Sequence, residues 1–179
     1  DAIDTINCGK TRSPGDVLSI NGYHNTQIMA PAVRLAYIYD VLNNDMVVRK
    51  GVTVTNDVIA RYAEYLMPKI AESVDVAATG AHLFNRSIMA FCHLVFARSD
   101  SDKANIFFHL LKTGENLSSG HPVLTLRAKL LDGRVAGRKK ISVREEVALY
   151  FKAWNVFVRG KSILRLSWNP EFETFPTVK

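Results

Sequence analysis

Residues 85–98, which read NRSIMAFCHLVFAR, decide the fold that this sequence predicts. Asn85 is of a residue type that begins helices, and the run after it is apolar nearly all round. A helix that is apolar on every side is buried on every side, so this stretch predicts the central helix of the core. Cys92 and His93 lie inside the run and are interpreted as core side chains. A metal site shared with His109 of a neighbouring helix is the alternative.

The rest of the chain predicts further helices around this one. Residues 25–42 carry apolar side chains at helical spacing, and Pro31 is expected to mark the true first residue of that helix. Ser142 and Glu145 form the Ser-x-x-Glu pattern of a capping box, before a helix whose apolar stripe includes Trp154. About seven helices are expected, over residues 14–18, 25–42, 55–76 with a kink or restart at Pro68, 88–98, 103–112, 122–131 and 142–159.

The expected fold class is therefore mostly α, in a single compact multi-helix domain, which suits a chain of 179 residues. Residues 14–168 are expected to form this domain, with an extended stretch near residues 163–166. Residues 169–179 carry two prolines and are expected to lie over the body as a tail.

Composition narrows the class of protein. The chain is 47% hydrophobic, which is enough for a core, and holds no apolar run of about 18 residues, so no membrane span is expected. No signal-peptide pattern opens it. Cys8 and Cys92 lie 84 positions apart in different surroundings, which argues against a disulfide framework. A reducing compartment follows, and the cytoplasm is the expected location.

Charge is distributed unevenly along the chain, whose formal net charge is +6. Residues 127–165 hold 11 Lys and Arg against 3 acids, a charge of +8, so the remaining 140 residues sum to −2. A basic block on a nearly neutral body is typical of a surface that contacts a polyanion, and a solvated face without a partner is the alternative. The candidate nucleic-acid-binding residues are Arg127, Arg134, Arg138, Lys139, Lys140 and Arg144.

These residues surround a basic loop that leads into the helix beginning near Ser142. The amides of a helix start favour phosphate, so contacts to the nucleic-acid backbone with weak sequence preference are expected. Trp154 would suit base stacking, but its place on the apolar stripe favours a core role.

The stretch NCGKTRSPGD, residues 7–16, contains the Gly-Lys-Thr that ends a phosphate-binding loop. Asp4 stands where that motif needs its first Gly, and a carboxylate there would repel phosphate. Pro14 follows too soon for a helix to begin on Thr11, so the stretch is interpreted as a basic turn before a helix. The chain lacks the H-E-x-x-H, C-x-x-C and G-x-S-x-G patterns, so no catalytic residue, metal or cofactor is predicted.

Three segments carry a family resemblance: DTINCGKTRSPGDVL (4–18), TGENLSSGHPVLTLRAKLL (113–131) and REEVALYFKAWNVFVRGKSILRLSW (144–168). In this order they resemble the C-terminal helical region of ParB/sulfiredoxin-like domain proteins of phages and bacteria. The resemblance implies that residues 1–13 are a junction from a missing upstream α/β domain, with a short N-terminal strand as its remnant. That family's own His- and Arg-bearing motif is absent from this chain.

The resemblance also implies that Lys10 and Arg12 contact a phosphate held by the missing domain. Arg12 has Asp16 four residues further on as an alternative partner. Members of the superfamily include nucleotide-binding, nuclease-like and kinase-like proteins, and many act on or near DNA.

Three functional hypotheses follow. The leading one is an accessory helical domain that contacts nucleic-acid backbone, DNA rather than RNA, through the basic loop and the helix start. The second is a protein-interaction or homo-oligomerisation module whose basic loop is only solvated. The third is part of a nucleotide-dependent enzyme whose catalytic domain is missing, with Lys10 and Arg12 in a shared site; on its own the chain is not expected to be an enzyme.

Overall fold

The computed structural model describes residues 13–42, 45–80, 83–135, 137 and 140–179. Within these residues the protein is all helical, with eight α-helices, one π-helical segment and no strand, which confirms the expected fold class. The strand expected before residue 13 lies outside the described residues. The elements are α1 (Pro14–Ile20), α2 (Thr26–Tyr37), η1 (Ile38–Leu42), α3 (Asn56–Leu66), α4 (Lys69–Ala78), α5 (Arg86–Ala97), α6 (Ser101–Thr113), α7 (Pro122–Asp132) and α8 (Val143–Phe157).

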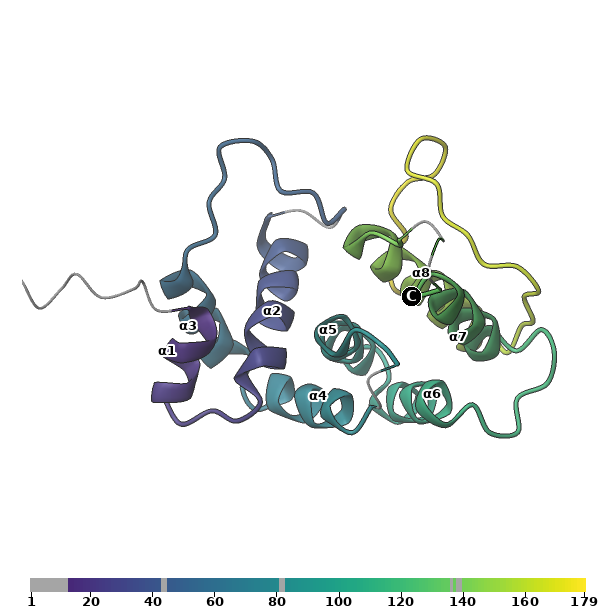
Figure 1. Ribbon diagram of the computed structural model, residues 1–179, viewed down its shortest axis with the longest axis horizontal. Coiled ribbons are helices and arrows are strands. Elements are labelled where there is room, and N and C mark those ends of the chain that lie inside the picture. The colour runs from purple at the N-terminus through teal and green to yellow at the C-terminus, as the bar shows by residue number, and fades with distance from the viewer. Residues whose placement is uncertain (1–12, 43–44, 81–82, 136, 138–139) are drawn as a thin grey trace, which may run out of the picture.

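Helix α5 is the hub of the fold (Figure 1). It contacts α2, α4, α6 and α8, while α1 and α3 pack on α2, and α7 packs on α6 and α8. Every residue from Ile88 to Phe96 is buried, as the apolar run predicts. The Asn85 side chain begins the helix by accepting hydrogen bonds from the backbone N–H groups of Ser87 and Ile88 at 3.2 and 3.3 Å.

An aromatic layer joins α5 to α6 and α8. The Trp154 ring lies flat on Phe96, with ring centroids 4.5 Å apart and planes at 14°, and Phe107 of α6 meets the Trp154 ring edge-on. Phe91 and Phe151 stack further along the same pair of helices. Trp154 is fully buried, so its interpretation as a core residue is confirmed.

His93 is the one histidine that the central helix buries, and it is a satisfied core residue as predicted. Its Nδ1 lies 2.9 Å from the Ser73 hydroxyl of α4, and its Nε2 lies 3.0 Å from the side-chain amide oxygen Oδ1 of Asn105 in α6. Burial lowers the pKa of the imidazole, which favours the neutral ring. The neighbouring Cys92 is fully buried, and burial raises the pKa of its thiol well above the usual range.

Two prolines have different effects on the helices. The prediction that Pro31 begins the second helix was wrong, because α2 starts at Thr26 and continues through the proline. Ile28, Met29 and Ala30 are buried ahead of Pro31, and this burial keeps the first turn helical despite the missing amide donor. Pro68 separates α3 from α4, so the chain restarts there and has one helix more than expected.

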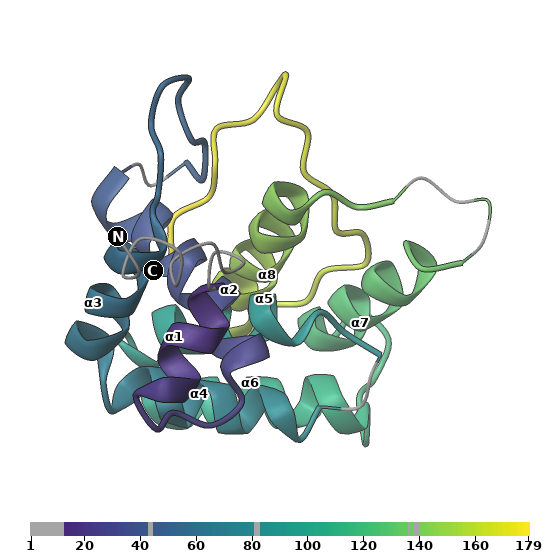
Figure 2. The same cartoon turned by 60° about the vertical axis from the view of Figure 1, so that its left-hand side comes forward.

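The C-terminal residues return along α8 (Figure 2). Lys152 of α8 holds them at two points, the backbone oxygen of Ser167 at 2.5 Å and the carboxylate of Glu173 at 2.6 Å. Asn155 donates to the Thr177 oxygen at 2.7 Å and accepts from the Lys179 amide at 3.0 Å. None of the described helices has the length and apolar character that crossing a membrane requires.

The aromatic layer predicts a large loss of stability for Phe96→Ala, about 3–5 kcal/mol, because the truncation leaves a cavity under Trp154. Chemical denaturation followed by circular dichroism measures it. Phe172→Ala is the matched control, since Phe172 is 83% exposed, and its effect should stay within about 0.5 kcal/mol. Equal effects of the two truncations would contradict the assignment of α5 as the hub.

Candidate nucleic-acid interface

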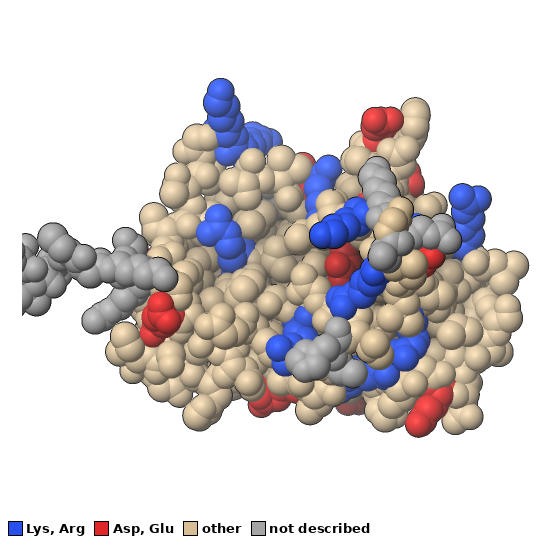
Figure 3. All heavy atoms as spheres, viewed as in Figure 1, with Lys and Arg blue, Asp and Glu red and all other residues tan. Residues whose placement is uncertain are grey.

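The predicted basic segment forms α7, the loop after it and α8. Figure 3 shows one face of the molecule, seen from the same side as in Figure 1. Lys and Arg atoms are concentrated on the half of this face that α5 to α8 form. The half formed by α1 and α3 carries fewer of them. The uneven charge of the sequence therefore corresponds to an uneven distribution of Lys and Arg on the face that Figure 3 shows.

The loop between α7 and α8 brings Gly133 against the Ile141 side chain. A Cβ added at Gly133 would come within 2.6 Å of the end of that side chain, so any larger residue would require Ile141 to move. We use the name basic loop surface for Arg134, Arg138, Lys139 and Lys140. Arg138 and Lys139 themselves lie outside the described residues.

Arg134 and Lys140 are both exposed and line one hollow of about 370 Å³. Leu130, Gly133 and Ile141 contribute to the same hollow. The structure thus places the two described members of the basic loop surface on the same hollow, both exposed to solvent.

Glu146, on the first turn of α8, is affected by the charge of Arg134 in this loop. Burial raises the pKa of its carboxyl group to about 7, and the positive charge of Arg134 opposes the rise. The carboxylate also raises the pKa of the buried Tyr150 phenol, after the larger effect of burial. The Tyr150 hydroxyl has no hydrogen-bond partner in the described part of the chain. Sequence reasoning missed this carboxyl group, because Glu145 and Glu146 differ only in the face of α8 that they occupy.

Arg127 is used inside the fold. Its Nη1 donates to the Leu111 and Lys112 carbonyl oxygens at 2.5 and 3.1 Å, which satisfies the C-terminal end of α6. Its guanidinium also lies over the Phe84 ring, 5.5 Å from the centroid. Of the predicted nucleic-acid-binding residues, Arg127 therefore joins α7 to α6 and is held apart from the basic loop surface.

Arg144 is held in a similar way. Its Nε donates to the Asp45 carbonyl oxygen at 2.8 Å. Its guanidinium lies over Trp168 at 4.9 Å and near Phe175 at 5.7 Å, both from the C-terminal residues. Arg144 thereby links α8 to two segments that are distant in the sequence, which no spacing rule reveals.

The start of α8 is capped as predicted. The Ser142 hydroxyl accepts a hydrogen bond from the Glu145 amide at 3.2 Å, which is one of the two bonds of a capping box. Glu145 and Glu146 stand in the first turn. Two carboxyl groups and an occupied amide weaken the attraction of this helix start for phosphate.

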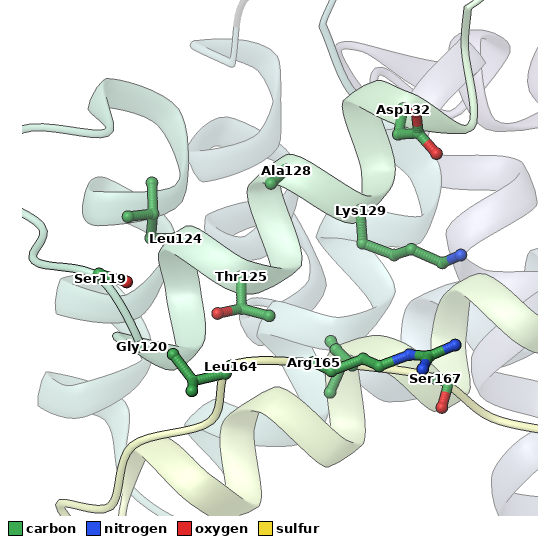
Figure 4. A pocket seen from close by; sticks show the side chains of 11 residues that line it. Ser119, Gly120, Leu124, Thr125, Ala128, Lys129, Asp132, Leu164, Arg165 and Ser167 are labelled. Atoms are coloured by element: carbon green, nitrogen blue, oxygen red, sulfur yellow. The ribbon is translucent and has the colours of Figure 1, made fainter.

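A groove beside α7 is lined by two further basic side chains, which were not among the predicted nucleic-acid-binding residues (Figure 4). It has a volume of about 540 Å³ and lies between α7 and residues 164–167. Lys129 and Arg165 reach toward the same end of it, where Asp132 also lies. The Ile163 amide donates to the Gly120 oxygen at 2.8 Å and thereby holds the start of this segment near α7.

The remaining predicted sites can be placed only in part. Lys10 and Arg12 lie outside the described residues. In the part of the chain that the structure describes, no group of three or more His, Cys, Asp or Glu side chains is arranged to hold a metal ion.

The raised pKa of Glu146 predicts a pH-dependent stability. Its folded-state pKa of about 7 exceeds the ordinary 4.5, so its contribution is fully present below pH 4.5 and is lost as the pH rises through 7. The shift corresponds to at most about 3 kcal/mol. Glu146→Gln should therefore gain stability relative to the wild type between pH 5 and 8, in denaturation curves recorded across that range. Glu171→Gln, which removes the same charge from an exposed site, is the control; parallel pH profiles of wild type and Glu146→Gln would refute the assignment.

Arg144→Ala should destabilise the fold by about 1–3 kcal/mol, because it removes a hydrogen bond to a backbone oxygen and the contacts to two rings. Arg144→Lys keeps the charge without the planar group and should recover only part of the loss. Lys140→Ala, at an exposed position nearby, should leave the free energy of unfolding nearly unchanged. Thermal or chemical denaturation distinguishes these cases, and full recovery by lysine would show that charge alone matters.

Comparison of the chain with protein-family models, curated proteins and solved structures found no match in any of the three. The resemblance to the helical region of ParB/sulfiredoxin-like proteins therefore stays a prediction.

Proposed function

We propose that this chain binds the phosphate backbone of nucleic acid through the basic loop surface. The observation that supports the proposal is the placement of Arg134 and Lys140 on one exposed hollow, within a segment of charge +8. Arg127 and Arg144 contribute indirectly, because they hold α6 and the C-terminal residues against the helices that carry the loop.

The physical basis of binding is electrostatic. Lys and Arg that neutralise phosphates release condensed counterions, so affinity falls steeply with salt and depends little on sequence. The loop is short and offers backbone contacts rather than a helix placed to read base edges. DNA is the preferred polymer, on the strength of the resemblance stated above. Lys129 and Arg165, on the neighbouring groove, extend the positive surface beyond the loop.

The test is binding to a duplex across a salt series, measured by fluorescence anisotropy. The double variant Arg134→Ala/Lys140→Ala should weaken binding and reduce the slope of log K against log salt by about 1.8. The matched control is Arg159→Ala/Lys161→Ala, which removes the same charge from two exposed residues at the other end of α8.

The two double variants separate a defined surface from net charge. Equal losses would mean that overall charge alone drives binding, and a flat salt response of the wild type would overturn the proposal. Parallel titrations with double-stranded RNA and double-stranded DNA decide the preferred polymer.

A second function, association with another protein or a second copy, is favoured by the segment 45–54, which we call the arm. The arm projects from the body in both ribbon views. It exposes Val47, Val48 and Val52 and turns at Gly51, whose φ is +90°. A concentration-dependent mass in light scattering that Val48→Asp abolishes would support association. The enzymatic alternative depends on Lys10 and Arg12 and stays a prediction.

A further inference from the structure

A second cleft, separate from the basic loop surface, lies where η1, α3, the start of α4 and the end of α5 meet. Its volume is about 650 Å³. Leu66 and Leu94 are buried residues among those that line it. The polar and aromatic lining comes from Asp40, Tyr62, Tyr65, Lys69 and Arg98.

Asp40 organises the polar side of the cleft. Its carboxylate accepts hydrogen bonds from both terminal nitrogens of Arg98, at 2.8 Å each. It also accepts a hydrogen bond from the Tyr62 hydroxyl at 2.7 Å. This is a bidentate pair, the geometry in which a guanidinium is held most rigidly. Asp40 belongs to η1, and single π-helical turns of this kind occur frequently at functional sites.

The aromatic side of the cleft is an exposed tyrosine held in place by another. Tyr65 is 77% exposed, and its ring stacks on Tyr62 with centroids 5.6 Å apart and planes at 24°. Tyr62 is fixed in turn by its bond to Asp40 and by edge-on contact with Tyr37, whose ring centroid is 5.3 Å away. The Tyr65 ring thus lies on a rigid support with most of its surface open to solvent, which is the arrangement of a stacking platform.

Positive charge stands at the same cleft. Arg98 is paired with Asp40 and also interacts with the Tyr62 hydroxyl, yet a guanidinium has five N–H donors, so some of them can still donate to a ligand. The Arg98 side chain is 34% exposed. Lys69 is exposed, has no ion-pair partner among the described residues and supplies the uncompensated charge.

We infer that this cleft binds an unpaired nucleotide. The base stacks on Tyr65, and the phosphate is held by Lys69 and the free N–H groups of Arg98. Stacking alone does not require a phosphate, and cations alone do not require a flat ring; a nucleotide satisfies both. A base inside a duplex has both faces covered by its neighbours, so the ligand is a free nucleotide or a nucleotide of a single strand.

The test measures binding of a nucleoside monophosphate by calorimetry and of a short labelled single-stranded oligothymidylate by anisotropy. Tyr65→Ala should weaken the binding of at least one of them by on the order of 10-fold or more, while Tyr65→Phe keeps the stack and the affinity. Phe172→Ala is the matched control, because it removes another highly exposed ring. Lys69→Ala should lower affinity and reduce the salt slope for the single strand by about 0.7, while Lys161→Ala should not.

The two binding measurements decide the source of the ligand. Tyr65-dependent binding of the monophosphate identifies a free-nucleotide site, and binding of the oligomer alone identifies a single-strand site; either supports the inference. The inference is overturned if Tyr65→Ala and Phe172→Ala have equal effects, or if a nucleoside without phosphate binds as tightly as the monophosphate. Binding of the Tyr65→Ala variant to a DNA duplex tests the basic loop surface separately, because Tyr65 does not line that surface. The two proposals can therefore fail independently.

Discussion

The burial of α5 on all sides is the constraint on which the rest of the structure depends. A helix with nine consecutive buried residues has no face for water, so other helices must surround it. His93 makes the packing specific, because its two ring nitrogens need partners and find them on α4 and α6. Among the described residues no Lys, Arg, Asp or Glu is fully buried, so the charged side chains lie at partly or fully exposed positions.

At those outer positions the cations have two different uses. Arg127 and Arg144 turn back onto carbonyl oxygens and aromatic rings and connect distant segments. Arg134 and Lys140 face solvent on the loop between α7 and α8. Arg98 combines both uses, since it is fixed by Asp40 while it lines an open cleft. A count of charges along the sequence treats all of these residues alike.

Local patterns predicted the helices well where packing agreed with them. Asn85 and Ser142 cap helices in the structure as their residue types favour, and Trp154 is buried on the stripe that its spacing defined. Pro31 is the instructive failure, because the residues buried ahead of it outweigh the loss of one amide donor. The π-helical turn at η1 likewise has no local signal.

The sequence by itself determined that the chain is helical, that residues 88–98 supply its central helix and that its positive charge is concentrated in residues 127–165. Periodicity, capping and charge are properties of neighbouring residues, so they can be read without the tertiary structure. Only the tertiary structure decided which arginines face inward and which face solvent. It also brought Asp40 and Arg98 together across 58 positions, with two tyrosines beside them. Such pairings depend on how helices that are distant in the sequence pack against each other, and a pattern of neighbouring residues does not predict that packing.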